Sequence, residues 1–173
     1  MITENNYRYN SGIYKKSFYG RMINGQAVSY VSGMRYGICN MSFNGCEVIA
    51  VHNALVYMKK ARPVYEVSRY MERFRMLAGF FGCNPHKIGN ALGHFGIKYK
   101  KSRQIGNSEI FIVSFWTGRR FLSTIHTVFC IRSNNTILVF NRYNNYPDVS
   151  FCMNDMQIAN HKEIIAVYTI KGV

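Results

Sequence analysis

The order of the periodic segments along the chain constrains its fold more than any other feature. Apolar residues recur with helical spacing between residues 44 and 96, whereas the segments beyond residue 96 are short and rich in β-branched and aromatic residues. Helices followed by a run of strands are typical of an α+β domain with an antiparallel sheet. Because 173 residues suffice for one hydrophobic core, we predict a single domain of the α+β class.

The segment 44–60, NGCEVIAVHNALVYMKK, is predicted to be a buried helix. Asn44 can cap its start, Glu47 suits the positive end of the helix dipole, and two lysines suit the negative end. Its apolar residues surround most of the cylinder, which is typical of a helix without a solvent face. We therefore expect this helix to lie in the centre of the domain.

Two more helices and five strands complete the predicted elements. The helices run from Pro63 to about Ala78, and from the cap Asn84-Pro85 to Gly93 or Gly96. The strands are 97–101, 109–116, 123–132, 136–143 and 163–170. Ser133-Asn134-Asn135 is predicted to form a hairpin turn.

The first 37 residues are rich in Asn, Tyr, Gly and Ser. We expect an irregular lead-in over 1–37, with one short strand at 26–32, and a folded domain over 38–173. No apolar run approaches the roughly 18 residues of a membrane span, and the amino terminus lacks the pattern of a secretory signal. The sequence therefore predicts a cytoplasmic protein, with an unconventional export route left open.

The charge balance is strongly basic, because 22 Lys and Arg face 8 Asp and Glu for a net charge of +14. Such a field attracts acidic peptides, polyanions or anionic surfaces. Aromatic residues interleaved with basic ones also suit nucleic acids. However, the basic residues are spread over the whole chain and no nucleic-acid signature is present, so nucleic-acid binding is not the predicted main function.

The five cysteines, Cys39, Cys46, Cys83, Cys130 and Cys152, are scattered and odd in number. This argues against a disulfide framework and favours free thiols. The only metal-like spacing is Cys83-x-x-His86, which without a second such pair is weak evidence for zinc. We predict neither a metal nor a cofactor.

Cys46 has the position of a cysteine nucleophile. It lies in the first turn of the predicted central helix, where unpaired backbone N–H groups and the helix dipole favour a thiolate. The alternative is a small buried cysteine that only packs, which is the commoner fate of a cysteine.

His126 is the best candidate for a base. It lies within a predicted strand, where a buried imidazole needs a polar partner. His52 lies six positions after Cys46 on the same helix, which turns it about 120° away from the thiol. Asn141 lies across the predicted hairpin from His126 and could hold the imidazole in one tautomer, as the third member of a triad does. A structural role for His126 remains the alternative.

The stretches FNGCEVIAVHNAL, IHTV and VFNRY, within residues 38–145, resemble the papain-like cysteine peptidases, and among them the small bacterial double-glycine leader peptidases and their free-standing relatives. The resemblance implies a central helix packed on an antiparallel sheet, with the cleft between them. It implies Cys46 as nucleophile, His126 as general base and acid, and Asn141 as orienting residue. The family's oxyanion-hole glutamine stands six residues before the cysteine, where this chain has Asn40.

The expected function is cleavage of a peptide bond through an acyl-enzyme on Cys46, with the Cys46 N–H and Asn40 as oxyanion donors. The expected partner is a peptide or protein substrate, and the charge favours an acidic one. The same constellation can run deamidation, acyl transfer or transglutamination on a protein side chain. A different class of function is an idle papain-like scaffold whose basic surface binds RNA or an acidic partner.

Overall fold

The computed structural model describes residues 1–118 and 124–171. Its main sheet has six antiparallel strands in the order β3-β8-β4-β5-β6-β7. The strands are β3 (Tyr99–Ser102), β4 (Ile110–Trp116), β5 (Ile125–Ser133), β6 (Thr136–Phe140), β7 (Ser150–Cys152) and β8 (Ile164–Ile170). A short second sheet pairs β1 (Arg35–Tyr36) with β2 (Cys39–Asn40).

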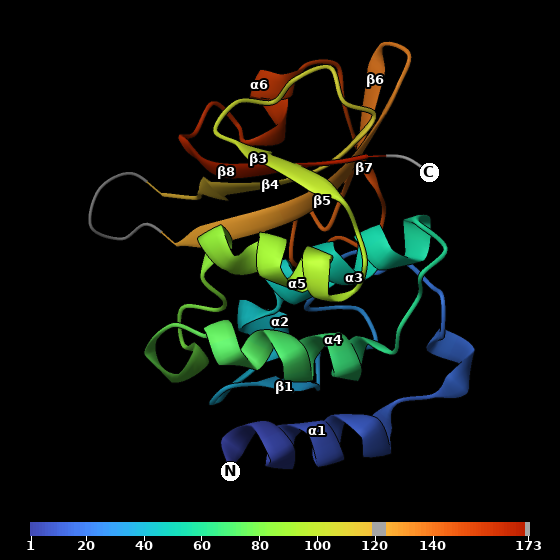
Figure 1. The fold of residues 1–173 in the computed structure, drawn as a ribbon, viewed down its shortest axis with the longest axis vertical. Helices are drawn as coiled ribbons and strands as arrows, with labels where there is room; N and C mark the ends of the chain where they lie inside the picture. Colours follow the sequence, from blue (N-terminus) through green and yellow to red (C-terminus); the bar gives the residue numbers. More distant parts are fainter. Residues whose placement is uncertain (119–123, 172–173) are drawn as a thin grey trace.

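The helices gather mostly on one side of the main sheet (Figure 1). They are α1 (Ile2–Ile13), α2 (Met41–Asn44), α3 (Cys46–Tyr57), α4 (Val64–Met71), α5 (Ile88–His94) and α6 (Asp155–Ile158). The 3-10 turns are η1 (Lys16–Phe18), η2 (Glu72–Phe74), η3 (Leu77–Gly79) and η4 (Pro85–Lys87). In Figure 1, α3 and α5 lie next to the sheet, α4 lies beyond them, and α1 is farthest from the sheet.

The main sheet is covered on both faces, which explains why its central strands are nearly all apolar. In β4, Ile110 and Ile112 belong to the core shared with the helices, whereas Phe111 and Val113 belong to a second core on the opposite face. The second core is closed by Ile158 of α6. Because successive side chains of a strand point to opposite faces of the sheet, both faces of β4 are removed from water.

The predicted α+β class is confirmed, and so is the central helix. Ten of the twelve residues of α3 are buried, and α3 packs against β5 and α4. The helix begins at Cys46 after Gly45, so Asn44 is not its cap as predicted. Asn44 instead ends α2, and its amide donates to the carbonyls of Tyr36 and Gly79, which face it from other segments.

The other predicted elements are confirmed in part. The helix expected over 63–78 ends at Met71, and two 3-10 turns follow, the second containing Ala78 at a φ of 55°. The Asn84 side chain accepts from the His86 N–H at 2.9 Å, as a cap should. The five predicted strands match β3, β4, β5, β6 and β8, with Ser123 of the predicted third strand outside the described residues.

The first 37 residues differ from the irregular lead-in that we expected. They contain α1, and the strand predicted at 26–32 is a series of turns. Asn10 donates to the Arg35 carbonyl and accepts from the Arg35 N–H, which ties α1 to β1. Hydrophobic periodicity misses such a segment because amide-to-backbone hydrogen bonds hold it. Among the described residues, no helix is both long enough and apolar enough to cross a membrane.

Candidate active site

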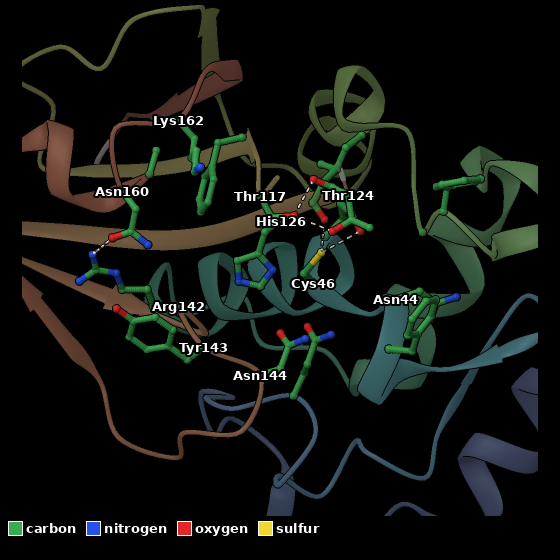
Figure 2. Close-up of a pocket in the computed structure, with 18 of the residues that line it drawn as sticks. Asn44, Cys46, Thr117, Thr124, His126, Arg142, Tyr143, Asn144, Asn160 and Lys162 are labelled. Atoms are coloured by element: carbon green, nitrogen blue, oxygen red, sulfur yellow. Dashed lines mark hydrogen bonds between the residues drawn. The ribbon is translucent and has the colours of Figure 1, made fainter. Parts of the chain in front are cut away.

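A cleft of about 600 Å³ contains both Cys46 and His126 in its lining (Figure 2). Cys46 comes from the first turn of α3, and His126 comes from the second position of β5. Other parts of the lining come from residue 26, Phe43 and Asn44 of α2, the turn at 80–82, the segment 142–145 after β6, and the segment 159–162 before β8. The structure thus brings together a thiol and an imidazole that are 80 residues apart in the chain.

The Cys46 thiol is buried, with 5% of the residue exposed. It donates to Glu47 Oε2 at 3.3 Å and contacts the Ile125 carbonyl oxygen at 3.9 Å; Figure 2 shows dashed lines at its sulfur. Burial first, and then the Glu47 carboxylate, raise the pKa of the Cys46 thiol well above its ordinary value. Loss of solvation and the neighbouring carboxylate therefore oppose the thiolate that the helix start led us to expect.

A short hydrogen bond to the backbone helps to hold His126. Its Nε2 lies 2.6 Å from the backbone carbonyl oxygen of Asn141. A carbonyl can only accept, so Nε2 carries the proton and Nδ1 of the neutral ring is left with a lone pair. Burial lowers the pKa of His126, against hydrogen bonds that raise it, which favours this neutral form. The Phe115 ring lies edge-on to the imidazole at 5.8 Å.

Asn141 meets His126 through its backbone and not through the side-chain amide that we expected. The residue has a φ of 58°, a left-handed conformation that asparagine adopts more readily than most residues. Its side chain points to Gln26, accepting from the Gln26 N–H at 2.9 Å and donating to Gln26 Oε1 at 3.0 Å. Asn24 also accepts from the Asn141 N–H. Asn141 therefore connects the imidazole to the N-terminal segment.

Gln26 is a site residue that sequence reasoning missed. It lines the cleft, is 1% exposed, and donates from Nε2 to the Ser42 carbonyl at 3.1 Å. Because Gln26 Oε1 accepts from Asn141, the other end of the Gln26 side-chain amide is the donor. This Nε2 has two N–H groups, and the Ser42 carbonyl accepts from one of them. No local signal marked it, since it lies 115 residues from Asn141 in the chain.

Asn40, the implied oxyanion donor, lies elsewhere. It is exposed on β2 and lines a different hollow, between α1 and the small sheet, together with Ile2 and Asn5. The pairing of Asn40 with Arg35 in that sheet directs this part of the loop away from Cys46. Asn44 does line the cleft, but its N–H groups are already committed to two carbonyls.

The lining of the cleft contains an aromatic group and a basic group. Phe43, Phe80 and Phe81 are exposed neighbours, with the Phe80 ring 5.7 Å from Phe43 and 5.3 Å from Phe81. Arg142 and Lys162 lie with Asn160 on the side of His126 away from Cys46 in Figure 2. Arg142 donates to Asn160 Oδ1 at 2.8 Å, which holds its charge at the cleft wall.

Two of the other histidines have structural surroundings. His52 Nε2 lies 3.0 Å from the Arg21 carbonyl, and burial lowers the pKa of its imidazole to about 4. His94 stacks on Tyr70, with the ring centres 3.7 Å apart. Within residues 1–118 and 124–171, no three His, Cys, Asp or Glu side chains are grouped so as to hold a metal ion.

The structure is similar to the crystal structure of a double glycine motif protease from an AMS/PCAT transporter in complex with its leader peptide. The superposition has a TM-score of 0.49 and 14% sequence identity, and it covers 74% of this chain and 84% of that chain. No family model and no curated protein matches the sequence. At this identity the likeness transfers no residue roles to this chain.

Proposed function

We propose that this chain is a papain-like cysteine peptidase with Cys46 as nucleophile and His126 as general base and acid. The observation that carries the proposal is the bond from His126 Nε2 to the Asn141 carbonyl. It leaves the basic Nδ1 in the same cleft as a thiol at a helix start. A nucleophile, a base and a group that orients the base are the three parts that thiol catalysis requires.

In the proposed reaction, Nδ1 of His126 takes the thiol proton and Sγ attacks the carbonyl carbon of the scissile peptide bond. The resulting oxyanion accepts from the Cys46 N–H and from the second N–H of Gln26 Nε2, which takes the role first assigned to Asn40. The imidazolium then gives its proton to the leaving amine, and the thioester forms. Water, deprotonated by His126, hydrolyses the thioester and restores the thiol.

The walls of the cleft support a substrate with two kinds of side chain. The aromatic rings at 43, 80 and 81 suit an apolar residue, whereas Arg142 and Lys162 suit an acidic one. The charge of +14 adds long-range attraction for an acidic peptide. We therefore propose peptides that carry an apolar residue and an acidic residue near the bond that is cleaved.

Thiol labelling tests the nucleophile without knowledge of the substrate. Cys39 is half-buried and the other four cysteines are buried, so exposure alone predicts that Cys39 reacts first. An electrophilic peptide that resembles an acyl-enzyme intermediate should instead label Cys46, and His126→Ala should abolish that labelling. A peptide library should be cleaved by the unmodified protein and by Cys39→Ala, but not by Cys46→Ala. Labelling that follows exposure and an uncut library would refute the proposal.

The second candidate is an idle scaffold that binds an acidic partner or RNA. The raised pKa of the Cys46 thiol favours it, because a buried neutral thiol is a poor nucleophile. Such a module would bind acidic peptides or RNA equally well as Cys46→Ala, and the unmodified protein would leave both unchanged. Deamidation or acyl transfer would instead appear in the same assay as a mass change on a side chain of an intact peptide.

A further inference from the structure

Glu47 lies against the proposed nucleophile, in a buried position where a charged carboxylate is costly. It is the second residue of α3 and is 1% exposed, with Oε2 at 3.3 Å from Cys46 Sγ. The carboxylate also accepts from the Cys83 N–H at 3.5 Å. The sequence pattern assigned Glu47 only to the helix dipole, but the side chain lines the catalytic cleft.

No cation compensates this carboxylate within the described part of the chain. The ion pairs there involve Glu4, Glu72 and Asp155 as their acids. The groups that face Glu47 from other segments, Cys83 and the Tyr36 hydroxyl of β1, are themselves acids whose pKa is raised by burial and by Glu47. His126 faces the same cleft from β5, and its pKa is lowered.

A carboxylate and a thiolate cannot both be charged at this distance in a buried site without a large cost. The carboxylate therefore holds the thiol proton in an S–H···O bond. Once the carboxyl is neutral, His126 Nδ1 can take that proton without creating a second anion beside the first. The pKa of Glu47 is raised by burial to about 7, so the carboxyl changes its charge near neutral pH.

We propose that Glu47 suppresses ionisation of the Cys46 nucleophile, since its carboxylate retains the proton of Cys46 until the carboxylate is itself neutralised. This inference rests on the proposed role of Cys46. Glu47 touches the reacting sulfur, but in this scheme it forms no bond to substrate. Glu47 sets how readily the thiol ionises. Acidification toward pH 6 protonates its carboxylate, which then no longer retains the thiol proton.

The test is the alkylation rate of Cys46 in Glu47→Gln, measured with iodoacetamide from pH 5 to 10 and mapped by mass spectrometry. Gln retains the size and a polar contact but has no charge. We expect the apparent pKa of Cys46 to fall by at least one unit, so that alkylation at a pH below both values becomes at least tenfold faster. Glu72→Gln is the matched control, because Glu72 is equally buried but lies outside the cleft lining; it should leave the Cys46 rate unchanged.

Alkylation of a folded Glu47→Gln protein at the unmodified rate would overturn the proposal. If that variant does not fold, carbon NMR of the unmodified protein decides: Glu47 should titrate near pH 7 while Cys46 stays a thiol. A Glu47 carboxyl that titrates near 4.5 beside a Cys46 thiolate at pH 8 would also overturn it. Faster alkylation of Glu47→Gln without any peptide cleavage would support the role of Glu47 and reject the peptidase. Peptide cleavage together with an unchanged alkylation rate in Glu47→Gln would support the peptidase and reject the role of Glu47.

Discussion

Two regions of the molecule share one apolar core but differ in the hydrogen bonds that fasten them to it. The central helix α3 and the strands are packed through apolar side chains, as in the contact of α3 with β5. The N-terminal segment 1–37 contributes apolar residues such as Ile23 and Met34 to the same core, and it is also tied down by amide side chains that bond to backbone groups. Asn53 of α3, for example, accepts from the Ile23 N–H and donates to the Ile23 carbonyl, both at 2.8 Å. The Asn53 side chain thus bonds both backbone groups of Ile23, as the backbone of a neighbouring strand would.

The candidate site draws on both regions. Cys46 and His126 come from the apolar core, whereas Gln26 comes from the amide-bonded segment. Asn141 joins them, since its carbonyl meets His126 and its side chain meets Gln26. Residues 1–37 are thus part of the proposed catalytic machinery. Variants in the two regions distinguish effects on catalysis from effects on how the segment is attached to the core.

The largest effect is expected from Gln26→Ala. Loss of one oxyanion donor should lower kcat by about 10²–10³, with smaller changes in the alkylation rate of Cys46. Steady-state cleavage of the best library peptide measures it. Asn40→Ala is the matched control and should retain full kcat, since Asn40 lines another hollow. A larger loss of kcat in Asn40→Ala than in Gln26→Ala would reverse this assignment.

A somewhat smaller effect is expected from Asn53→Ala, which removes both bonds to Ile23. Two buried backbone groups would lose their partner, at a cost of about 2–4 kcal/mol in the free energy of unfolding. Urea unfolding followed by circular dichroism measures this. Asn135→Ala, at an exposed position of the hairpin turn, serves as control and should change stability by less than about 0.5 kcal/mol. Equal stability of the two variants would show that the amide bonds do not hold the segment.

The smallest effect is expected at the surface of α1. Glu4 pairs with Arg69 of α4 at 2.8 Å, and both side chains are about half exposed. Water and salt screen such a pair, so Glu4→Ala should cost less than about 1 kcal/mol, and added salt should shrink the difference. The same urea titration, repeated at low and high salt, gives the comparison. A cost as large as that of Asn53→Ala would mean that this surface ion pair contributes as much to stability as the buried amide bonds.

Much of the core could be predicted because its signals are local. The apolar cylinder of α3, the Asn84-Pro85 cap and the strand patterns all depend on residues within one element. The same local reasoning placed Cys46 at a helix start and His126 on a strand. It failed for Asn44 and for the helix beyond Met71, where contacts with other segments override the local preference.

The sequence by itself determined the helix-then-strand order, the free cysteines, and which thiol and imidazole we propose as nucleophile and base. Only the tertiary structure decided which group bonds to His126, that Gln26 lines the cleft in place of Asn40, and that Glu47 accepts the thiol proton. The physical reason is that ionisation and hydrogen bonding depend on burial and on neighbours distant in the chain. A helix start favours a thiolate locally, but burial and one adjacent carboxylate oppose that preference at Cys46.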